Sequence, residues 1–259
     1  MTPVMIRFLP IVTSLTTGAL YLRERRIRRN LERLGAATLE SLLDAIDANS
    51  PETGDHVRRV ASYSLVIGDA VGLSEPDLRD VERVALFHDI GKLDGAVSDI
   101  VAEPKKLTPS ERKSMHVHPR RGAEVLGPLK AFYPELPKGV LAHHERWDGK
   151  GYPHQLRRTA IPMTARIVSI ADTFDAITHD RSYSNAKSIE EARERMLEGR
   201  GTQFDPDLLD LFLSPPVFRA IMKSMQRSHS PRRRGEGRRK RKQKPETPDV
   251  SFRWRRQAP

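Results

Sequence analysis

Two adjacent histidines, His143 and His144, stand in the segment LAHHERWDGKGYP, just ahead of a turn rich in glycine. Consecutive residues on a helix point about 100° apart, so these two imidazoles are poorly placed to chelate one ion and well placed to reach two. His88 and Asp89, adjacent in HDIGK, can do the same if the carboxylate bridges. A cluster of two or three ions of this kind can clamp the attacking and leaving oxygens of a displacement at phosphorus.

Further nitrogen and oxygen donors are spread along the chain. Glu52 and His56 are four residues apart, so they share one face of a helix. His118 precedes a proline, and Asp172 stands in an otherwise apolar helical segment. The sequence contains no cysteine, which excludes disulfides, thiolate zinc sites and iron–sulfur clusters. Any metal must therefore be held by nitrogen and oxygen.

Each of these positions has another interpretation when it is taken alone. Glu52 and His56 are typical of a helix-surface pair. His88 and Asp89 can form a helix C-terminal pair in which the dipole favours a charged imidazole. Asp172 can be a buried acceptor for a backbone group. Their joint occurrence in one helical body favours the metal cluster.

Helical periodicity covers most of the segments that would position these ligands. Apolar residues recur every three or four positions over 23–46 and again over 51–71, where Gly72 ends the pattern. Ser74 is an N-cap candidate for a third helix, which we expect to end near FHDIG.

Later segments carry start signals of the same kind. Thr108 in LTPSERK and Ser188 in SIEEARERML each begin a capping box, with a glutamate three residues later. Another helix is expected after Pro162, and FDPDLLDLFL is expected to be the last, with a Pro-Pro pair at 215–216 behind it. The sequence has no convincing alternation of apolar residues and no Gly-rich phosphate loop, so we predict an all-α body.

Charge divides the chain into a neutral body and a basic end. The 259 residues carry a formal net charge of +11, and residues 227–259 hold 13 Lys and Arg against 3 Asp and Glu. This end lacks apolar periodicity, so we expect it to be disordered. It can bind anionic lipid or nucleic acid, or it can be a solubilising tail with no partner.

The beginning of the chain is the only candidate for a membrane segment. The stretch from Phe8 to Leu22 is uncharged, but fifteen residues at about 1.5 Å each fall short of a hydrocarbon core of about 30 Å. Counting from Val4 gives a hydrophobic N-terminal helix flanked by RERRIRR, a positive-inside signal. We predict a cytoplasmic protein, with anchoring to the inner face of the membrane and binding of a partner left as alternatives for this helix.

Five motifs together resemble those of the HD-GYP domains, a branch of the HD superfamily of metal-dependent phosphohydrolases. They are HDIGK, HPRRGAEVL, HHERWDGKGYP, ARIVSIADTFDAITHDRSY and GTQFDP, in the family order over roughly residues 38–215. The resemblance implies an HD-type helical bundle with a GYP extension. It implies hydrolysis of cyclic di-GMP to pGpG and GMP by metal-hydroxide attack on phosphorus. The chain then divides into an N-terminal segment (1–37), the phosphohydrolase domain (38–226) and the basic tail (227–259).

By this resemblance, eight residues are metal ligands: Glu52, His56, His88, Asp89, His118, His143, His144 and Asp172. The reading ETGDH resembles family members that hold three metals, so two or three divalent ions are expected, of iron or manganese. The other histidines match no ligand position and are expected in solvent: His116, His154, His179 and His229.

The resemblance also implies catalytic and substrate-binding residues. Asp89 and Lys92 are the catalytic candidates, and Lys92 with Arg181 would contact the substrate phosphate. The sequence departs from the family after Lys92 and has Ser184 where a second phosphate-binding base is expected. Another cyclic dinucleotide or nucleotide therefore stays open as substrate.

A different class of function is an interaction module that docks a diguanylate cyclase or another partner through its GYP face. The complete ligand set favours the enzyme, because a scaffold has no physical need of it. In either case the glycines of WDGKGYP permit a tight loop under His143 and His144 without touching the chemistry. The sequence does not indicate the oligomeric state.

Overall fold

Helices make up the regular structure of the chain. The computed structural model describes residues 3–93, 108–180 and 186–228, without the side chains of 3–19, 28, 112 and 228. Within the described residues there is no strand beyond one isolated bridge between Arg200 and Phe204. The prediction of an all-α body is confirmed.

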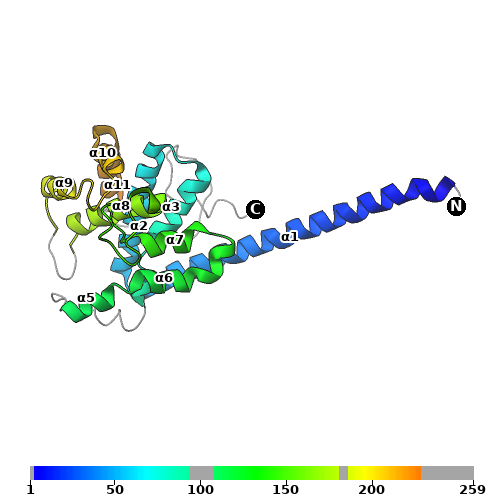
Figure 1. The fold of residues 1–259 in the computed structure, drawn as a ribbon, viewed down its shortest axis with the longest axis horizontal. Coiled ribbons are helices and arrows are strands. Elements are labelled where there is room, and N and C mark those ends of the chain that lie inside the picture. The colour runs from blue at the N-terminus through cyan, green and yellow to red at the C-terminus, as the bar shows by residue number, and fades with distance from the viewer. Residues whose placement is uncertain (1–2, 94–107, 181–185, 229–259) are drawn as a thin grey trace, which may run out of the picture.

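Figure 1 shows the helices in their arrangement along the chain. In chain order they are α1 (Pro3–Asn49), α2 (Pro51–Val71), α3 (Glu75–Phe87), η1 (Ile90–Leu93), α5 (Pro109–Met115), α6 (His118–Leu126), η2 (Gly127–Ala131), α7 (Glu135–Ala142), η3 (Arg158–Ala160), α8 (Met163–Thr178), α9 (Ile189–Glu198), α10 (Pro206–Leu213) and α11 (Pro215–Ser228).

The helix ends lie where the capping signals predict them. Helix α2 starts behind Ser50, whose side chain accepts from the Thr53 amide, and it ends at Gly72 with φ 83°. Ser74 caps α3 in the same way. At α9, Ser188 forms a complete capping box. The caps of α2 and α3 fix the start of the helix that carries the predicted ligand His56 and of the helix that leads into His88.

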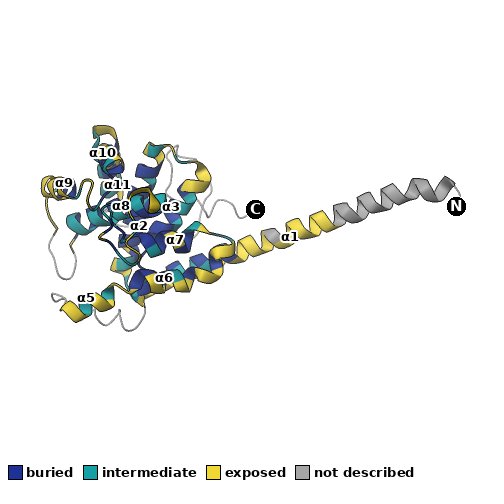
Figure 2. Cartoon of the chain, in the orientation of Figure 1, coloured by how far each residue is buried: buried dark blue, intermediate teal, exposed yellow. Residues whose placement is uncertain are grey.

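Helix α2 is central to the body, in contact with α1, α3, α8, α10 and α11. Its Val60, Tyr63 and Ile67 have no exposed surface. The Tyr63 ring packs edge-on against Phe174 of α8, with centroids 5.8 Å apart. Figure 2 shows this buried interior, together with the exposed outer surfaces of α5 and α9.

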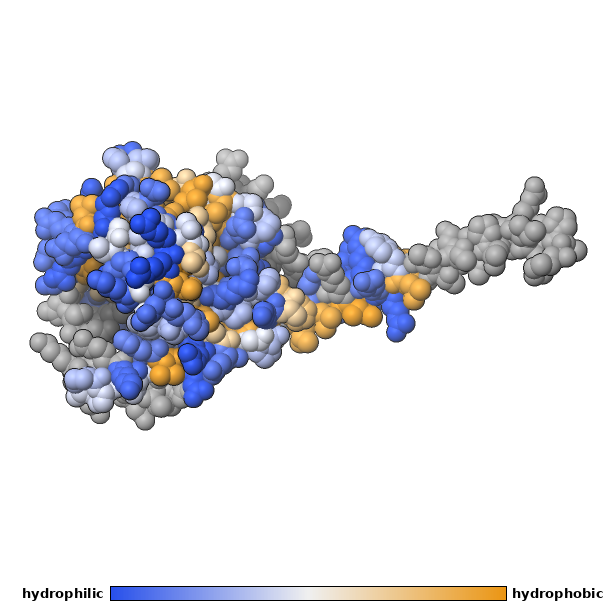
Figure 3. Space-filling model, viewed as in Figure 1, coloured by the Kyte–Doolittle hydropathy of each residue, from blue (hydrophilic) through white to orange (hydrophobic). Residues whose placement is uncertain are grey.

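Helix α1 joins the helix expected from Val4 and the helix expected over 23–46 into one continuous helix of 47 residues. Its C-terminal part enters the core through Leu39, Leu43 and Ile46. The preceding part projects from the body (Figure 1), and Figure 3 shows apolar surface along it. The exposed apolar side chains there include Leu20, Ile27, Leu31 and Leu34. In the described part of the chain, no helix combines the length and apolar character needed to cross a membrane.

The prediction that FDPDLLDLFL is the last helix is wrong, because α11 follows it directly. Pro215 and Pro216 lie in the first turn of α11, where a missing amide hydrogen costs no helical hydrogen bond. Val217, Phe218 and Ile221 are buried in the same core as α2. Residues 229–259, most of the predicted disordered tail, lie outside the described residues.

Candidate metal centre

Seven of the eight predicted metal ligands come together in two adjacent groups. In each group the ligand atoms lie within 4.8 Å of one another. The first group is Asp89, His118, His143 and His144, and the second is His56, His88 and Asp172. They are brought together by the second turn of α2, the middle of α8, the ends of α3 and α7, and the start of α6. The expectation that His143 and His144 reach two different ions is wrong, because both rings fall in the first group, whereas the neighbours His88 and Asp89 divide between the groups as expected.

Helix ends orient three of the histidines. The last carbonyl groups of a helix have no intrahelical partner, and here each one faces the Nδ1 of a following imidazole. The pairs are His88 with Ala85 O at 2.8 Å, His118 with Met115 O at 2.7 Å and His143 with Val140 O at 2.6 Å. Because a carbonyl only accepts, each Nδ1 carries the hydrogen. Each neutral ring is then left with a lone pair on Nε2, the atom that faces the centre.

A carboxylate orients the fourth histidine in the same sense. His56 Nδ1 lies 2.6 Å from Asp175 Oδ2, and its Nε2 lies 3.4 Å from Asp172 Oδ1. An imidazole whose far nitrogen donates to a carboxylate or a backbone carbonyl is the usual arrangement of a metal-bound histidine.

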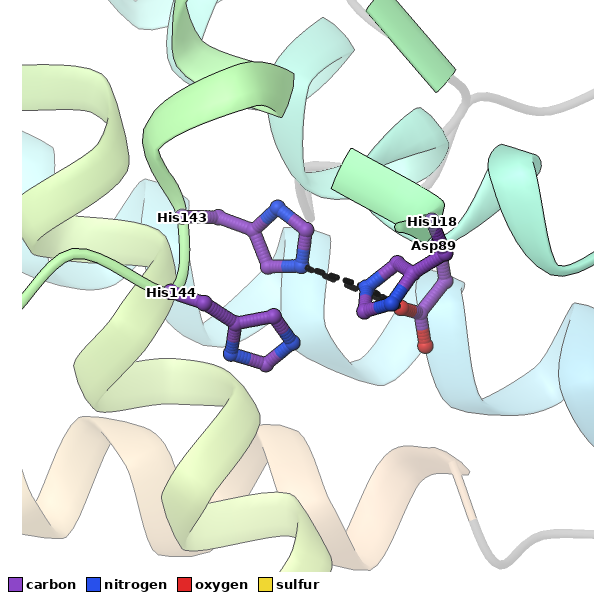
Figure 4. A group of neighbouring side chains, drawn as sticks. All are labelled: Asp89, His118, His143 and His144. Carbon is purple, nitrogen blue, oxygen red and sulfur yellow. Dashed lines mark hydrogen bonds and ion pairs between the residues drawn. The ribbon is translucent and has the colours of Figure 1, made fainter. Parts of the chain in front are cut away.

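Asp89 lies between the two groups and faces both. Its Oδ1 is 3.3 Å from His118 Nε2 and 3.9 Å from His143 Nε2. Its Oδ2 is 3.4 Å from His88 Nε2 and 4.0 Å from His56 Nε2. Figure 4 shows the carboxylate beside the facing rings of His118 and His143. This is the geometry of a bridging ligand.

The arrangement of the candidate ligand atoms suits bound cations better than hydrogen bonds between the ligands. His118 Nε2 and His143 Nε2 are 3.2 Å apart, and with both Nδ1 atoms protonated they present lone pairs to each other. Buried atoms without a hydrogen-bond partner among the described residues include His56 Nε2, His88 Nε2 and Asp89 Oδ1. Buried acceptors without donors are costly unless a cation lies between them.

The electrostatics favour the ligating protonation states of four of these residues. At His56, burial alone would lower the pKa, but the carboxylates of Asp172 and Asp175 outweigh burial and raise the pKa. Burial alone would raise the pKa of Asp89, but the Lys92 ammonium and the surrounding imidazoles hold it well below its ordinary value. The pKa of Asp172 is also well below its usual range. Burial and neighbouring histidines lower the pKa of His143, and burial lowers that of His144 to about 3. At neutral pH these carboxylates are charged and these two rings are neutral.

The loop after α7 is folded tightly under the histidine pair, as the glycines of WDGKGYP predict. A Cβ at Gly151 would lie 2.4 Å from Arg146 N and 2.6 Å from His144 O, so only glycine fits. Buried Glu145 accepts from the amides of His154 at 2.6 Å and Leu156 at 3.0 Å. Backbone contacts of the loop therefore fix the chain that carries His144.

The remaining predicted site residues have different outcomes. Lys92 donates to Asp89 Oδ2 at 2.6 Å, so its ammonium lies at the edge of the centre. Glu52 is exposed in the first turn of α2 and belongs to neither group. Its part in a third metal site stays a prediction. Arg181 and Ser184 lie outside the described residues.

Sequence reasoning missed Asp175, which holds the far side of His56. Its carboxylate accepts from Arg59 Nε at 2.7 Å and lies 3.1 Å from His179 Nδ1. The available signal was the second aspartate of ADTFD, one turn after Asp172 on the same helix. The expectation that His179 is solvated is wrong, because it is buried against this carboxylate. Two other histidines without a ligand role, His116 and His154, are exposed as expected, and His229 lies outside the described residues.

Comparison with known proteins gives matches over the same part of the chain. The family model described as HD domain matches residues 40–208. A 3'3'-cGAMP-specific phosphodiesterase of Vibrio cholerae is 38% identical over 175 residues, which cover 67% of this chain and 33% of the relative. A cyclic di-GMP phosphodiesterase response regulator of Xanthomonas campestris is 36% identical over 204 residues, covering 77% of this chain and 53% of the relative.

A solved structure has a similar fold. The crystal structure of a cyclic GMP-AMP specific phosphodiesterase of Vibrio cholerae matches with a TM-score of 0.54 at 24% identity, over 74% of this chain and 52% of that one. At this identity the likeness concerns the fold alone. The chain spans about a third to a half of the length of the relatives that it matches.

Proposed function

The chain belongs to the HD domain family, in its HD-GYP branch, and from this membership we propose that it is a metal-dependent phosphodiesterase that hydrolyses cyclic di-GMP to pGpG and GMP. The observation that carries the proposal is the pair of ligand groups joined by Asp89. Relatives named for the hydrolysis of cyclic di-GMP and of 3'3'-cGAMP support the substrate class.

Each ligand group would hold one divalent ion, with Asp89 shared between them. When bound, such ions polarise a phosphoryl oxygen and lower the pKa of a coordinated water. The protein's own part is to keep the four Nδ1–H imidazoles aimed at fixed points and to keep Asp89 ionised. The depressed pKa values of Asp89 and Asp172 support this role at neutral pH.

Two basic residues are proposed to bind the substrate phosphate. Lys92 already lies against the bridging carboxylate, at the rim of the centre. Arg181 matches the family position for phosphate contact, and a guanidinium suits bidentate pairing with phosphate. With serine at position 184, Arg181 would be the main anchor. Arg181→Ala is therefore expected to raise KM strongly.

Metal identity and number are part of the proposal. We propose iron or manganese, since the donors are imidazole nitrogens and carboxylate oxygens. Glu52 with His56 is proposed to add a third ion by the ETGDH resemblance. The exposed position of Glu52 gives this third site less support than the two buried groups.

The direct test is product analysis on a panel of cyclic di-GMP, 3'3'-cGAMP and cyclic di-AMP, with protein purified without oxygen. We expect pGpG and then GMP from cyclic di-GMP. His143→Ala should lose this turnover, because a ligand aimed at the centre is removed. His154→Ala is the matched control, since that imidazole is exposed and matches no ligand. Equal turnover in the two variants would contradict the proposal.

Preferential cleavage of 3'3'-cGAMP would keep the enzyme and change its substrate, the alternative that Ser184 leaves open. No turnover of any cyclic dinucleotide would favour the interaction module instead. The partners predicted for such a module stay proposals: a diguanylate cyclase at the GYP loop, and anionic lipid or nucleic acid at basic residues 227–259. A cytoplasmic location belongs to the same proposal. Membrane anchoring through residues 4–22 gains no support from the described helices.

A further inference from the structure

The tyrosine of the GYP sequence lies against one of the candidate metal ligands. The rings of Tyr152 and His144 are stacked, with centroids 4.9 Å apart and planes 30° apart. Tyr152 is also stacked on His116, at 4.0 Å and 14°. Both imidazoles stack on the same phenol ring. Tyr152 therefore contacts both the candidate ligand His144 and the exposed His116.

His144 is held differently from the other histidines of the centre. His88, His118 and His143 each donate from Nδ1 to a backbone carbonyl. In the described part of the chain, the hydrogen bonds include none to the His144 ring. Its ring contacts are with Tyr152, with His143 at a centroid distance of 4.1 Å and with His118 at 5.0 Å. Packing against rings is what fixes its direction.

The backbone places Tyr152 for this contact. The Tyr152 amide donates to the His144 carbonyl oxygen at 3.3 Å. The preceding residue, Gly151, is pressed against the backbone of 144–146 so closely that a Cβ there would lie 2.5 Å from Glu145 Cα. These backbone contacts of the loop therefore hold the Tyr152 ring against the imidazole of His144.

We propose that Tyr152 is a positioning residue for His144. The stacked Tyr152 ring supplies the orientation that backbone carbonyls supply to His88, His118 and His143 and that the Asp175 carboxylate supplies to His56. His116 completes the arrangement, because its ring is stacked on Tyr152 as well. His116 stands two residues before the candidate ligand His118. The stack of His144, Tyr152 and His116, here called the clamp, therefore links the GYP loop to the start of α6. The inference rests on the proposed metal centre.

The test is metal retention rather than activity. Anaerobically purified wild type, Tyr152→Leu and Tyr152→Phe are loaded with manganese, and metal per chain is followed during a challenge with a chelator. Tyr152→Leu is expected to release the ion of the His144 group at least tenfold faster, the size usual for loss of a group that orients a ligand. The His56, His88 and Asp172 group should keep its ion. Tyr152→Phe keeps the stacked ring and should behave as wild type.

Tyr133→Leu is the matched control, because this tyrosine packs under Arg83, at 4.3 Å from its ring, and not against a ligand. It should lose stability without faster metal release. If Tyr152→Leu releases metal at the wild-type rate, the inference is overturned. It is also overturned if Tyr152→Phe releases metal as fast as Tyr152→Leu, because the role would then belong to the hydroxyl group.

A wild type that binds no metal would overturn the proposed function instead. If Tyr152→Leu does not fold, His116→Ala decides, since it removes only the exposed ring. Its metal release should be measurably faster than that of wild type, and an unchanged rate would overturn the clamp.

Discussion

At the level of single residues, the centre depends on what holds the far side of each imidazole ring. Histidines and aspartates in the right order could be recognised from sequence, because the ligand types are chemically distinctive. The hydrogen-bond partner of each Nδ1 could not be predicted from sequence, because the backbone carbonyl of any residue can accept this hydrogen bond. Asp175 is the exception, because its place three residues after Asp172 puts both carboxylates on one helix face.

Asp175→Asn is expected to weaken metal binding and to change the response to acid. Burial would raise the pKa of Asp175, but hydrogen bonds from His179, His56 and Arg59 hold it well below its ordinary value. As the pH falls through about 4, the unfolded chain takes up a proton there that the folded protein does not. This residue therefore stabilises the fold above that pH and loses its contribution below it.

The measurement is the free energy of unfolding between pH 7 and pH 3, with metal content alongside. At pH 7 the variant should lose about 3 kcal/mol, because Arg59 keeps a half-buried charge without its full partner. Its stability should then fall less with acid than that of wild type. Asp210→Asn, in an exposed pair with Arg200, is the control and should change neither property appreciably. A variant with wild-type metal content and acid response would contradict the role given to Asp175.

At the level of elements, the sequence predicts best where the signals are local. The ends of α2, α3 and α9 follow from capping residues and from Gly72, all read within a few positions. Helix α11 was missed because its proline pair was taken as a stop, although proline is equally compatible with a first turn. For the loop after α7, the sequence predicts a tight turn but not the residues that the loop contacts, because these are distant along the chain. Trp147 N donates to Gln203 O at 3.2 Å, for example.

Gly151→Ala tests the loop as an element. The added methyl group would meet backbone atoms of residues 144–146 at 2.4 to 2.6 Å, so the chain carrying His144 must shift. A ligand displaced by about an ångström loses much of its affinity, and we expect at least tenfold weaker metal binding in the His144 group. Gly127→Ala is the control, because a methyl group there meets nothing within 4 Å. Isothermal titration with manganese is the measurement, and equal affinities in the two variants would contradict the account.

At the level of the whole molecule, the body extends past the matched HD domain region, which ends at residue 208. Helix α11 packs on α2, and Ile221 is fully buried there. We expect Ile221→Ala to lower the free energy of unfolding by about 2–5 kcal/mol, the range for a large-to-small change in a core. Metal content should be unchanged, because α11 carries no ligand. Arg219→Ala, exposed on the same helix, should have little effect, and equal stability of the two variants would show that α11 lies outside the folding unit.

Asp89 links the two halves of the centre and hence the helices that carry them. The most direct measurement is the metal content per chain of anaerobically purified wild type and Asp89→Asn, with circular dichroism to confirm folding. An amide keeps the size of the side chain, but it cannot offer an anionic oxygen to each group. The account predicts two or three ions in wild type and at most one in the variant, with the helical content retained. Equal metal content in a folded Asp89→Asn protein would contradict the bridged centre.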